Sequence, residues 1–324
     1  MMRVFVTRDG CLRQTDAKAD ALPQTALWVD LLNPSIDEIR PIEAAFKFQL
    51  PTREEMQEIE ASSRLYFEDG AHFMTATIVS RAETETPESH AITFILAEDR
   101  LVTLRYSEPL PFTTFPQRAE RQAGLWPNAP MVLAGLLETI IDRTADILER
   151  VSFEVEVLSR DIFGSKRSSE QLDGEDFQEF LQQLGRKNDL SSKVRESLIS
   201  VTRMLTFLAQ ATDGKANKDL KGHIKTMTRD VQSLADHTAF LSNKITFLLD
   251  ATLGMISIAQ NRVIKILAVG SMIFLPPTVL ASIWGMNFHT MPELDWLLGY
   301  PVALGAIVLS GVIPYVFFKM RGWL

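Results

Sequence analysis

The sequence is short of the residues that build most enzyme active sites and disulfide-bonded folds. It has one cysteine, Cys11, and five histidines in 324 residues. A single cysteine excludes an internal disulfide and a thiolate metal cluster, which fits a reducing compartment. No HExxH pair, GxSxG motif or phosphate-binding P-loop occurs in the sequence. We therefore predict that the protein is not an enzyme and has no catalytic cofactor.

Basic residues are scarce relative to acidic ones in most of the chain. The net charge is −8, but beyond residue 260 four basic residues stand against two acidic ones, so residues 1–260 carry −10. An acidic body excludes nucleic acid as the expected partner, because phosphate binding needs clustered Lys and Arg. Carboxylates suit hard divalent cations, which prefer oxygen ligands. Acidity also keeps many soluble proteins in solution, so charge alone leaves both interpretations open.

Two stretches, 266–286 and 297–318, contain no charged residue. Each has about the 20 residues that a helix needs to cross the hydrocarbon of a bilayer. Arg262 and Lys265 precede the first stretch, and Lys319 and Arg321 follow the second, whereas the connection 287–296 has no Lys or Arg. The positive-inside rule then predicts a multi-pass membrane protein with both termini in the cytoplasm and the connection outside.

Proline is absent from residue 131 to residue 275, which predicts long helices. The last of them has apolar residues in steps of four and three from Leu220 to Ala259, the spacing of a coiled-coil seam. No helix stop separates this seam from the first uncharged stretch. We therefore expect a stalk helix that is continuous with the first of two transmembrane helices.

Residues 1–130 have a different pattern, in which short apolar runs alternate with turn signals. Ala26–Leu31 reads as a strand, and Ser35 with Glu38 forms a capping box for a helix. The fold class expected is an α+β cytoplasmic domain, with a mixed sheet and helices, followed by long helices. The expected division is 1–130 for the α/β domain, 131–214 for long antiparallel helices, 215–265 for the stalk helix, 266–286 for the first transmembrane helix, 287–296 for the external loop, 297–318 for the second transmembrane helix and 319–324 for a cytoplasmic basic tail.

A polar stripe marks one face of the first transmembrane helix. At 100° per residue its upper four members fall within about 60°. The stripe consists of Asn261, Ile264, Leu267, Ser271, Leu275, Thr278 and Ser282, with Ala268 as the alternative to Leu267. Such a face either packs against another helix or lines a wet path, in which its apolar members would be constrictions. Two helices cannot enclose an aqueous pore, so conduction would require several copies around an axis.

The first transmembrane stretch ends in Gly285-Met286-Asn287, followed by Met291-Pro292-Glu293-Leu294. With this triplet and loop at the mouth of a C-terminal hairpin, the sequence resembles the CorA family of magnesium channels. The resemblance continues in Trp28–Leu31, in 51–70 and in the basic-aromatic tail, and it spans nearly the whole chain.

The resemblance implies a homopentameric funnel in the bacterial inner membrane, with the first transmembrane helix lining the pore. It assigns Gly285, Met286 and Asn287 to the selectivity filter, and it places the family's lower pore positions on the stripe. It implies influx of Mg²⁺, and of Co²⁺ and Ni²⁺, driven by the membrane potential and closed by cytoplasmic Mg²⁺. Two sets of carboxylates are candidates for attracting or binding these ions, Glu293 and Asp295 in the external loop and, as regulatory metal ligands, Asp230, Asp236, Asp250, Glu68 and Asp69.

Two other interpretations remain open from the sequence. A ZntB-like Zn²⁺ transporter shares the architecture, but a residue other than Met commonly stands in its triplet, so Met286 favours magnesium. His289 is the one residue near the mouth that favours zinc. A membrane-anchored regulatory protein without conduction would use the stripe only for packing.

Overall fold

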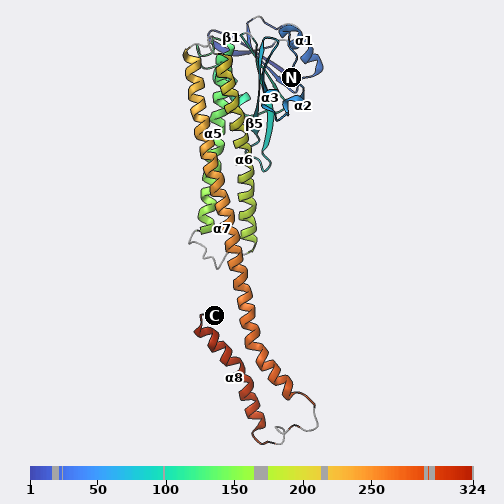
Figure 1. The fold of residues 1–324 in the computed structure, drawn as a ribbon, viewed down its shortest axis with the longest axis vertical. Helices are drawn as coiled ribbons and strands as arrows, with labels where there is room; N and C mark the ends of the chain where they lie inside the picture. Colours follow the sequence, from blue (N-terminus) through green and yellow to red (C-terminus); the bar gives the residue numbers. More distant parts are fainter. Residues whose placement is uncertain are drawn as a thin grey trace. The chain divides into compact units, whose positions relative to one another are not determined.

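The computed structural model describes the chain except residues 17–21, 24, 98, 164–173, 213–217, 288–290, 292–295 and 323–324. Two compact units divide the chain. The first contains Met1–Gly164 and Glu179–Leu249, and the second contains Ser165–Gln178 and Asp250–Leu324. Figure 1 colours both units along the sequence.

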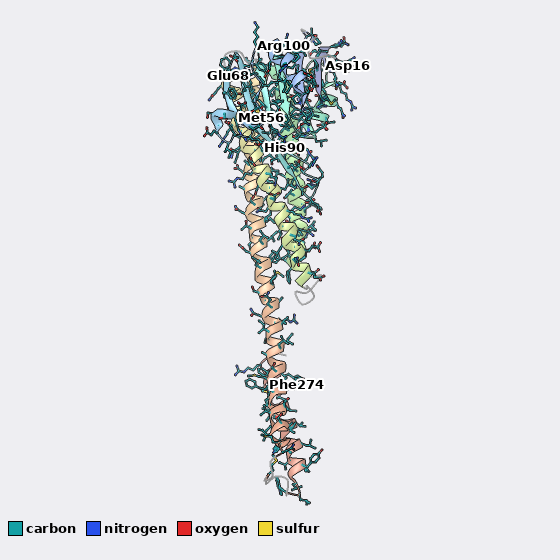
Figure 2. All side chains as sticks on the ribbon, turned by 90° about the vertical axis from the view of Figure 1, so that its right-hand side faces the viewer. Asp16, Met56, Glu68, His90, Arg100 and Phe274 are labelled. Carbon is teal, nitrogen blue, oxygen red and sulfur yellow. The ribbon has the colours of Figure 1, made fainter. Side chains whose placement is uncertain are left out.

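Seven strands of the first unit form one mixed sheet. They are β1 (Met2–Arg8), β2 (Cys11–Thr15), β3 (Ala26–Leu32), β4 (Leu65–Glu68), β5 (Ala71–Ser80), β6 (Glu88–Ala97) and β7 (Arg100–Arg105). The order is β2-β1-β3-β7-β6-β5-β4, and every neighbouring pair is antiparallel except β3 with β7. Glu68 and Arg100 lie at the end of the sheet where β4 turns into β5 and β6 into β7, and His90 lies toward the other end (Figure 2). The mixed sheet expected from the sequence is confirmed.

Helices cover both faces of this sheet. They are α1 (Ile36–Phe46), α2 (Arg53–Met56), α3 (Ala61–Arg64), α4 (Pro111–Ala119), α5 (Ala129–Phe163), α6 (Gly174–Ala211), α7 (Lys218–Trp284) and α8 (Gly299–Met320). On one face, Ile42 of α1 and Met56 of α2 share a core with Phe73 and Val102. On the other face, the ring of Trp28 lies 5.7 Å from that of Phe115 in α4.

The long helices run alongside the sheet in the first unit (Figure 1). The seam expected on α7 is buried at Leu220, Val231, Leu241 and Leu248. Its exposed flank is joined to α5 by an ion pair between Lys244 and Glu156. Because α7 continues unbroken to Trp284, the predicted continuity of the stalk helix with the first membrane helix is confirmed.

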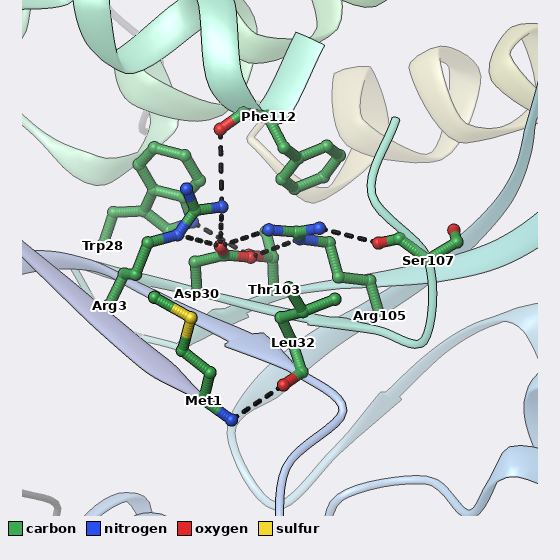
Figure 3. Close-up of polar contacts among 9 residues, drawn as sticks. All are labelled: Met1, Arg3, Trp28, Asp30, Leu32, Thr103, Arg105, Ser107 and Phe112. Atoms are coloured by element: carbon green, nitrogen blue, oxygen red, sulfur yellow. Dashed lines mark hydrogen bonds and ion pairs between the residues drawn. The ribbon is translucent and has the colours of Figure 1, made fainter. Parts of the chain in front are cut away.

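A buried ionic network joins three neighbouring strands, β1, β3 and β7 (Figure 3). Asp30 and Arg105 are completely buried, and two guanidinium nitrogens of Arg105 donate to the two Asp30 oxygens at 2.9 Å. Arg3 donates to Asp30 Oδ2 at 2.7 Å, and Thr103 Oγ1 donates to Oδ1 at 2.8 Å. The Trp28 indole N–H in turn donates to Thr103. The buried carboxylate is therefore fully paired, as burial of a charge requires.

Candidate ion pathway

The second unit holds two helices that are long and apolar enough to cross a membrane. They are α7 and α8, and the most apolar 18-residue window of each has a mean hydropathy of 2.0. Only 6% of each window is buried inside the chain. A core helix of a soluble protein would be mostly buried, so these two surfaces need another apolar environment.

One face of α7 packs against α8 within this unit. Val269 is only 2% exposed, and Ile273, Pro277 and Leu280 on the same face are half-buried. A Cβ added to Gly311 of α8 would lie 3.2 Å from Pro277 Cγ and 3.5 Å from the Ile273 carbonyl oxygen. The absence of a side chain at Gly311 therefore lets the two helices approach closely, as is common between membrane helices.

This close approach also covers backbone that the prolines leave unpaired. Pro276 and Pro277 stand inside α7 and have no N–H to donate to the carbonyls of Met272 and Ile273. Free carbonyls at membrane depth are tolerated only beside protein or water. Gly311 lies against the Ile273 carbonyl, so α8 shields this oxygen from lipid.

The polar stripe lies on the opposite face of α7. With 100° per residue, its centre falls about 180° from the face that packs on α8. All seven of its residues are exposed in the single chain, and Ile264, Leu267 and Leu275 have exposed fractions of 62%, 66% and 66%. Within the hairpin the stripe therefore makes no packing surface for α8, which removes intrachain packing as its explanation.

The three hydroxyls of the stripe share one hydrogen-bond pattern. Ser271, Thr278 and Ser282 each donate to the carbonyl four residues earlier, at 2.9, 2.7 and 2.8 Å. Because their protons are used inside the helix, the hydroxyl oxygens keep lone pairs that accept hydrogen bonds from outside. Such a surface suits the water shell of a cation, whose hydrogens point outward.

Helix α7 ends at Trp284, directly before the Gly285-Met286-Asn287 triplet noted in the sequence. The Gly285 N–H donates to the Ala281 carbonyl at 2.9 Å, and the Met286 N–H donates to that of Ile283 at 3.3 Å. A Cβ on Gly285 would lie 3.1 Å from the Ala281 oxygen, so a glycine suits this last turn. Asn287 follows directly and is exposed. The carboxylates expected in an external loop, Glu293 and Asp295, and also His289, lie outside the described residues.

The regulatory carboxylates expected from the sequence are dispersed. Glu68 and Asp69 form the exposed β4–β5 turn, and Asp236 accepts a hydrogen bond from Gln232. Among these five expected carboxylates, Asp230 is the one that lines a cleft of about 910 Å³ in the first unit. Asp250 belongs to the second unit. In the described part of the chain, no three His, Cys, Asp or Glu side chains converge to hold a metal ion.

Two carboxylates that sequence reasoning missed lie near Asp230. Glu138 lines the same cleft, and Asp142 follows one turn later on α5. Burial raises the pKa of Asp142, and the charges of Glu138 and Asp230 add to this effect against the opposing charge of Arg118. Their spacing on α5, four residues, was visible in the sequence, but their proximity to α7 was not.

The family model and the curated relatives that match this chain indicate the same family. The model of the family described as CorA-like Mg²⁺ transporter protein matches residues 23–320. The chain is 38% identical to the magnesium transport protein CorA of Pasteurella multocida over 325 residues, and 38% and 35% identical to those of Salmonella typhimurium and Escherichia coli K12. Each of these alignments covers all of both chains.

Solved structures share the fold at low sequence identity. The CorA magnesium transporter from Methanocaldococcus jannaschii gives a TM-score of 0.77 at 17% identity, with 100% of this chain and 99% of that chain covered. The full-length CmaX protein gives 0.68 at 14%, covering 100% and 98%. The ZntB cytoplasmic domain from Vibrio parahaemolyticus gives 0.59 at 9%, covering 78% and 96%. These likenesses cover 96% or more of each solved chain and 78% or more of this chain, and they concern the fold alone.

Proposed function

Since the chain belongs to the CorA family of Mg²⁺ transporters, we propose that it is a channel for Mg²⁺ influx across the bacterial inner membrane. The observation that carries this proposal is the exposed stripe of α7, which faces away from α8 and leads to Asn287. Copies of α7 arranged around an axis would bring these stripes together. A homopentamer, as the family resemblance implies, is the assembly we propose.

Asn287 acts as the outer selectivity ring in this proposal, with Gly285 and Met286 shaping the turn that presents it. Mg²⁺ gives up its waters reluctantly. A ring of amide oxygens accepts hydrogen bonds from the hydrated ion, so the pore does not need a full octahedral cage. The external carboxylates Glu293 and Asp295, repeated in each copy, would raise the local cation concentration at the mouth.

Below this ring, the stripe alternates between acceptors and apolar constrictions. Ser271, Thr278 and Ser282 would receive the water shell on their hydroxyl oxygens, because their protons are held by backbone carbonyls. Ile264, Leu267 and Leu275 would form narrow apolar rings, which gate by dewetting. Asn261, repeated in each copy, would form a polar ring at the cytoplasmic end of the stripe.

The membrane potential supplies the driving force for influx. It contributes about 2.3 kcal/mol per elementary charge for each 100 mV, and a divalent ion gains roughly twice that. With both termini cytoplasmic, an inside-negative potential draws the ion from Asn287 toward Asn261. Co²⁺ and Ni²⁺, which carry the same charge, would follow the same path.

Cytoplasmic Mg²⁺ would close the channel by binding to carboxylates of the N-terminal domain and stalk. Asp230 is the strongest candidate among the expected ligands, because it shares its cleft with Glu138. No single chain brings three ligands together in its described residues. Neighbouring copies would therefore complete the site, with Glu68, Asp69, Asp236 and Asp250 as further candidates.

The experiment that tests the proposal is Mg²⁺ uptake by liposomes that contain the purified protein. A trapped fluorescent indicator reports the ion while an inside-negative potential is imposed. We expect uptake by the wild type, its loss in Asn287→Ala, and its suppression when the liposomes are preloaded with Mg²⁺. Parallel assays with Co²⁺, Ni²⁺ and Zn²⁺ define the selectivity.

Each other outcome points to a named alternative. Zn²⁺ uptake without Mg²⁺ uptake would assign the protein to the zinc branch. No uptake of any of these ions, by folded and oligomeric protein without internal Mg²⁺, would leave a membrane-anchored regulator. Uptake that Asn287→Ala does not change would contradict the selectivity ring.

A further inference from the structure

A second, smaller cleft lies in the first unit, away from the proposed ion pathway. Its volume is about 180 Å³, and its walls come from α2, α3, β5, β6, the residue after β7 and α6. His90 and Met56, which both line it, mark its place in Figure 2. Most of the side chains that line this cleft are polar, and Met56 and Ala91 are its apolar members.

Two arginines, Arg53 and Arg64, line this cleft without an ion-pair partner in the part of the chain that the structure describes. The Arg53 guanidinium lies over the ring of Tyr106, 5.3 Å from its centroid. Arg64 is fixed by two hydrogen bonds, one to the Glu58 carbonyl and one to Thr77 Oγ1 at 3.0 Å. These bonds use Nε and Nη1, so the other guanidinium nitrogen of Arg64 keeps its donors for a ligand.

The position of Arg64 is held by the sheet edge beneath it. β4 pairs with β5 only as far as Met74, so the backbone of Thr77 has no strand beside it on that side. Ser200 of α6 takes the place of the missing strand, since it accepts from the Thr77 N–H at 2.9 Å and donates to the Thr77 carbonyl at 3.2 Å. An unpaired edge is thereby covered, and Thr77 is a fixed anchor for Arg64.

The hydroxyl groups of Ser89 and Tyr106 add two neutral donors to the two arginines that line the cleft. Ser89 Oγ is buried and has no hydrogen-bond partner among the described residues. A buried hydroxyl without a partner is costly, so Ser89 Oγ favours an acceptor brought into the cleft. Burial raises the pKa of Tyr106, against the effect of Arg53, so its phenol keeps its proton at neutral pH. Guanidinium and hydroxyl donors together are the groups that bind oxyanions.

Glu196 of α6 is the one carboxylate that lines the cleft in the described residues. It would repel an anion that has only acceptors, such as sulfate. Inorganic phosphate keeps a P–OH group near neutral pH even as its dianion, whereas a monoester, whose second pKa is about 6, is mostly a dianion without one. The P–OH group of inorganic phosphate can donate to the Glu196 carboxylate while the other oxygens accept from the arginines.

We propose that this cleft is a binding site for a phosphate group, held by Arg53, Arg64 and Ser89 and distinguished from sulfate by Glu196. The ligand is inorganic phosphate, because the Glu196 carboxylate would repel a fully ionised monoester as it repels sulfate. This inference does not depend on the proposed ion conduction, since the cleft contains none of the pore residues.

The test is isothermal titration of the full-length protein in detergent, in magnesium-free buffer without phosphate. Inorganic phosphate, glycerol 3-phosphate and sulfate are the three probes. We expect inorganic phosphate to bind at pH 7.5, and glycerol 3-phosphate and sulfate each to bind at least about tenfold more weakly, because neither has a proton to donate to Glu196. Arg53→Gln should weaken binding about tenfold or more, as loss of a charged hydrogen bond predicts.

Two further variants separate binding from folding. Arg40→Gln changes an exposed arginine of α1 outside the cleft, and it should bind as the wild type does. Glu196→Gln, on an exposed surface of α6, should bring sulfate binding close to phosphate binding. Absence of phosphate binding at millimolar concentration, equal phosphate binding by the wild type and Arg53→Gln, or sulfate or the ester bound as tightly as phosphate by the wild type would each overturn the proposal.

Discussion

At the scale of single residues, Asp30 determines how the polar core of the N-terminal domain is satisfied. It receives hydrogen bonds from Arg3, Thr103 and Arg105, and no part of it is exposed. Removing one partner of a buried pair leaves an uncompensated buried charge. The Trp28–Leu31 segment, noted in the sequence for its family resemblance, therefore has a structural reason for its aspartate.

We predict that Asp30→Ala lowers the free energy of unfolding by about 3–5 kcal/mol, because Arg105 would stay buried without a counter-charge. Denaturant unfolding of the purified protein measures this change. Asp37→Ala, at an exposed position of α1, is the control and should change stability little. A similar effect of the two substitutions would refute the role of the buried network.

The raised pKa of Asp142 predicts a dependence of stability on pH. Its native pKa lies above the ordinary carboxyl value of 3.8 because its carboxyl group is partly buried and because the charge of Glu138 lies nearby. The native state therefore favours the protonated form, and this contribution is present below the ordinary pKa and lost as pH rises through the native pKa. The ionised carboxylate is thus unfavourable at neutral pH.

We expect Asp142→Asn to raise the unfolding temperature at pH 7 slightly, by an amount equivalent to less than about 1 kcal/mol because the side chain is largely exposed. The gain should shrink toward pH 4. Asp161→Asn, at an exposed site on the same helix, controls for the substitution itself. A gain that grows as the pH falls would contradict the sign of this argument.

At the scale of elements, the helices were more predictable than the sheet. The proline-free stretch and the apolar seam indicated long helices, because both signals are local in sequence. β1 and β2 were missed although Asp9-Gly10, both with positive φ, is a hairpin signal. The cover that Ser200 gives to Thr77 lies 123 residues away in sequence and left no local pattern.

The candidate ion pathway was also only partly predictable from the sequence. The helical angle identified the stripe, but it could not decide between packing and a wet path. The position of α8, with Gly311 against Pro277, excludes packing of the stripe within the hairpin, and contact of the stripe with water is part of the proposed function. The neighbourhood of Asp230 with Glu138 also requires the tertiary structure, since α5 and α7 are far apart in sequence.

Contact between α7 and α8 gives a prediction for these two helices. Gly311→Leu should force the helices apart at Pro277 and destabilise the protein by about 1–3 kcal/mol, the usual cost of overpacking. Gly305→Leu, on the same helix with no atom within 4 Å of its Cβ position, is the matched control. Thermal unfolding in detergent compares them, and equal losses would refute a specific close approach at Gly311.

At the scale of the whole molecule, several copies of the chain together form the proposed ion pathway, which no single chain contains. A hairpin of two helices has one face for α8 and, opposite to it, one face without an intrachain partner. Family membership and the exposed, water-accepting stripe together lead to the proposed channel. Its function then depends on the stripe being in contact with water and ions in the assembled protein.

Blocking by a charged thiol reagent tests this claim most directly. In a Cys11→Ser background, which removes the one native cysteine, Thr278→Cys places a thiol on the stripe and Leu280→Cys places one on the face toward α8. Both variants are first shown to take up Mg²⁺ in liposomes. The account predicts that the reagent stops uptake by Thr278→Cys and leaves Leu280→Cys unchanged. Unchanged uptake by Thr278→Cys after its thiol is shown to be modified, or block of Leu280→Cys alone, would contradict it.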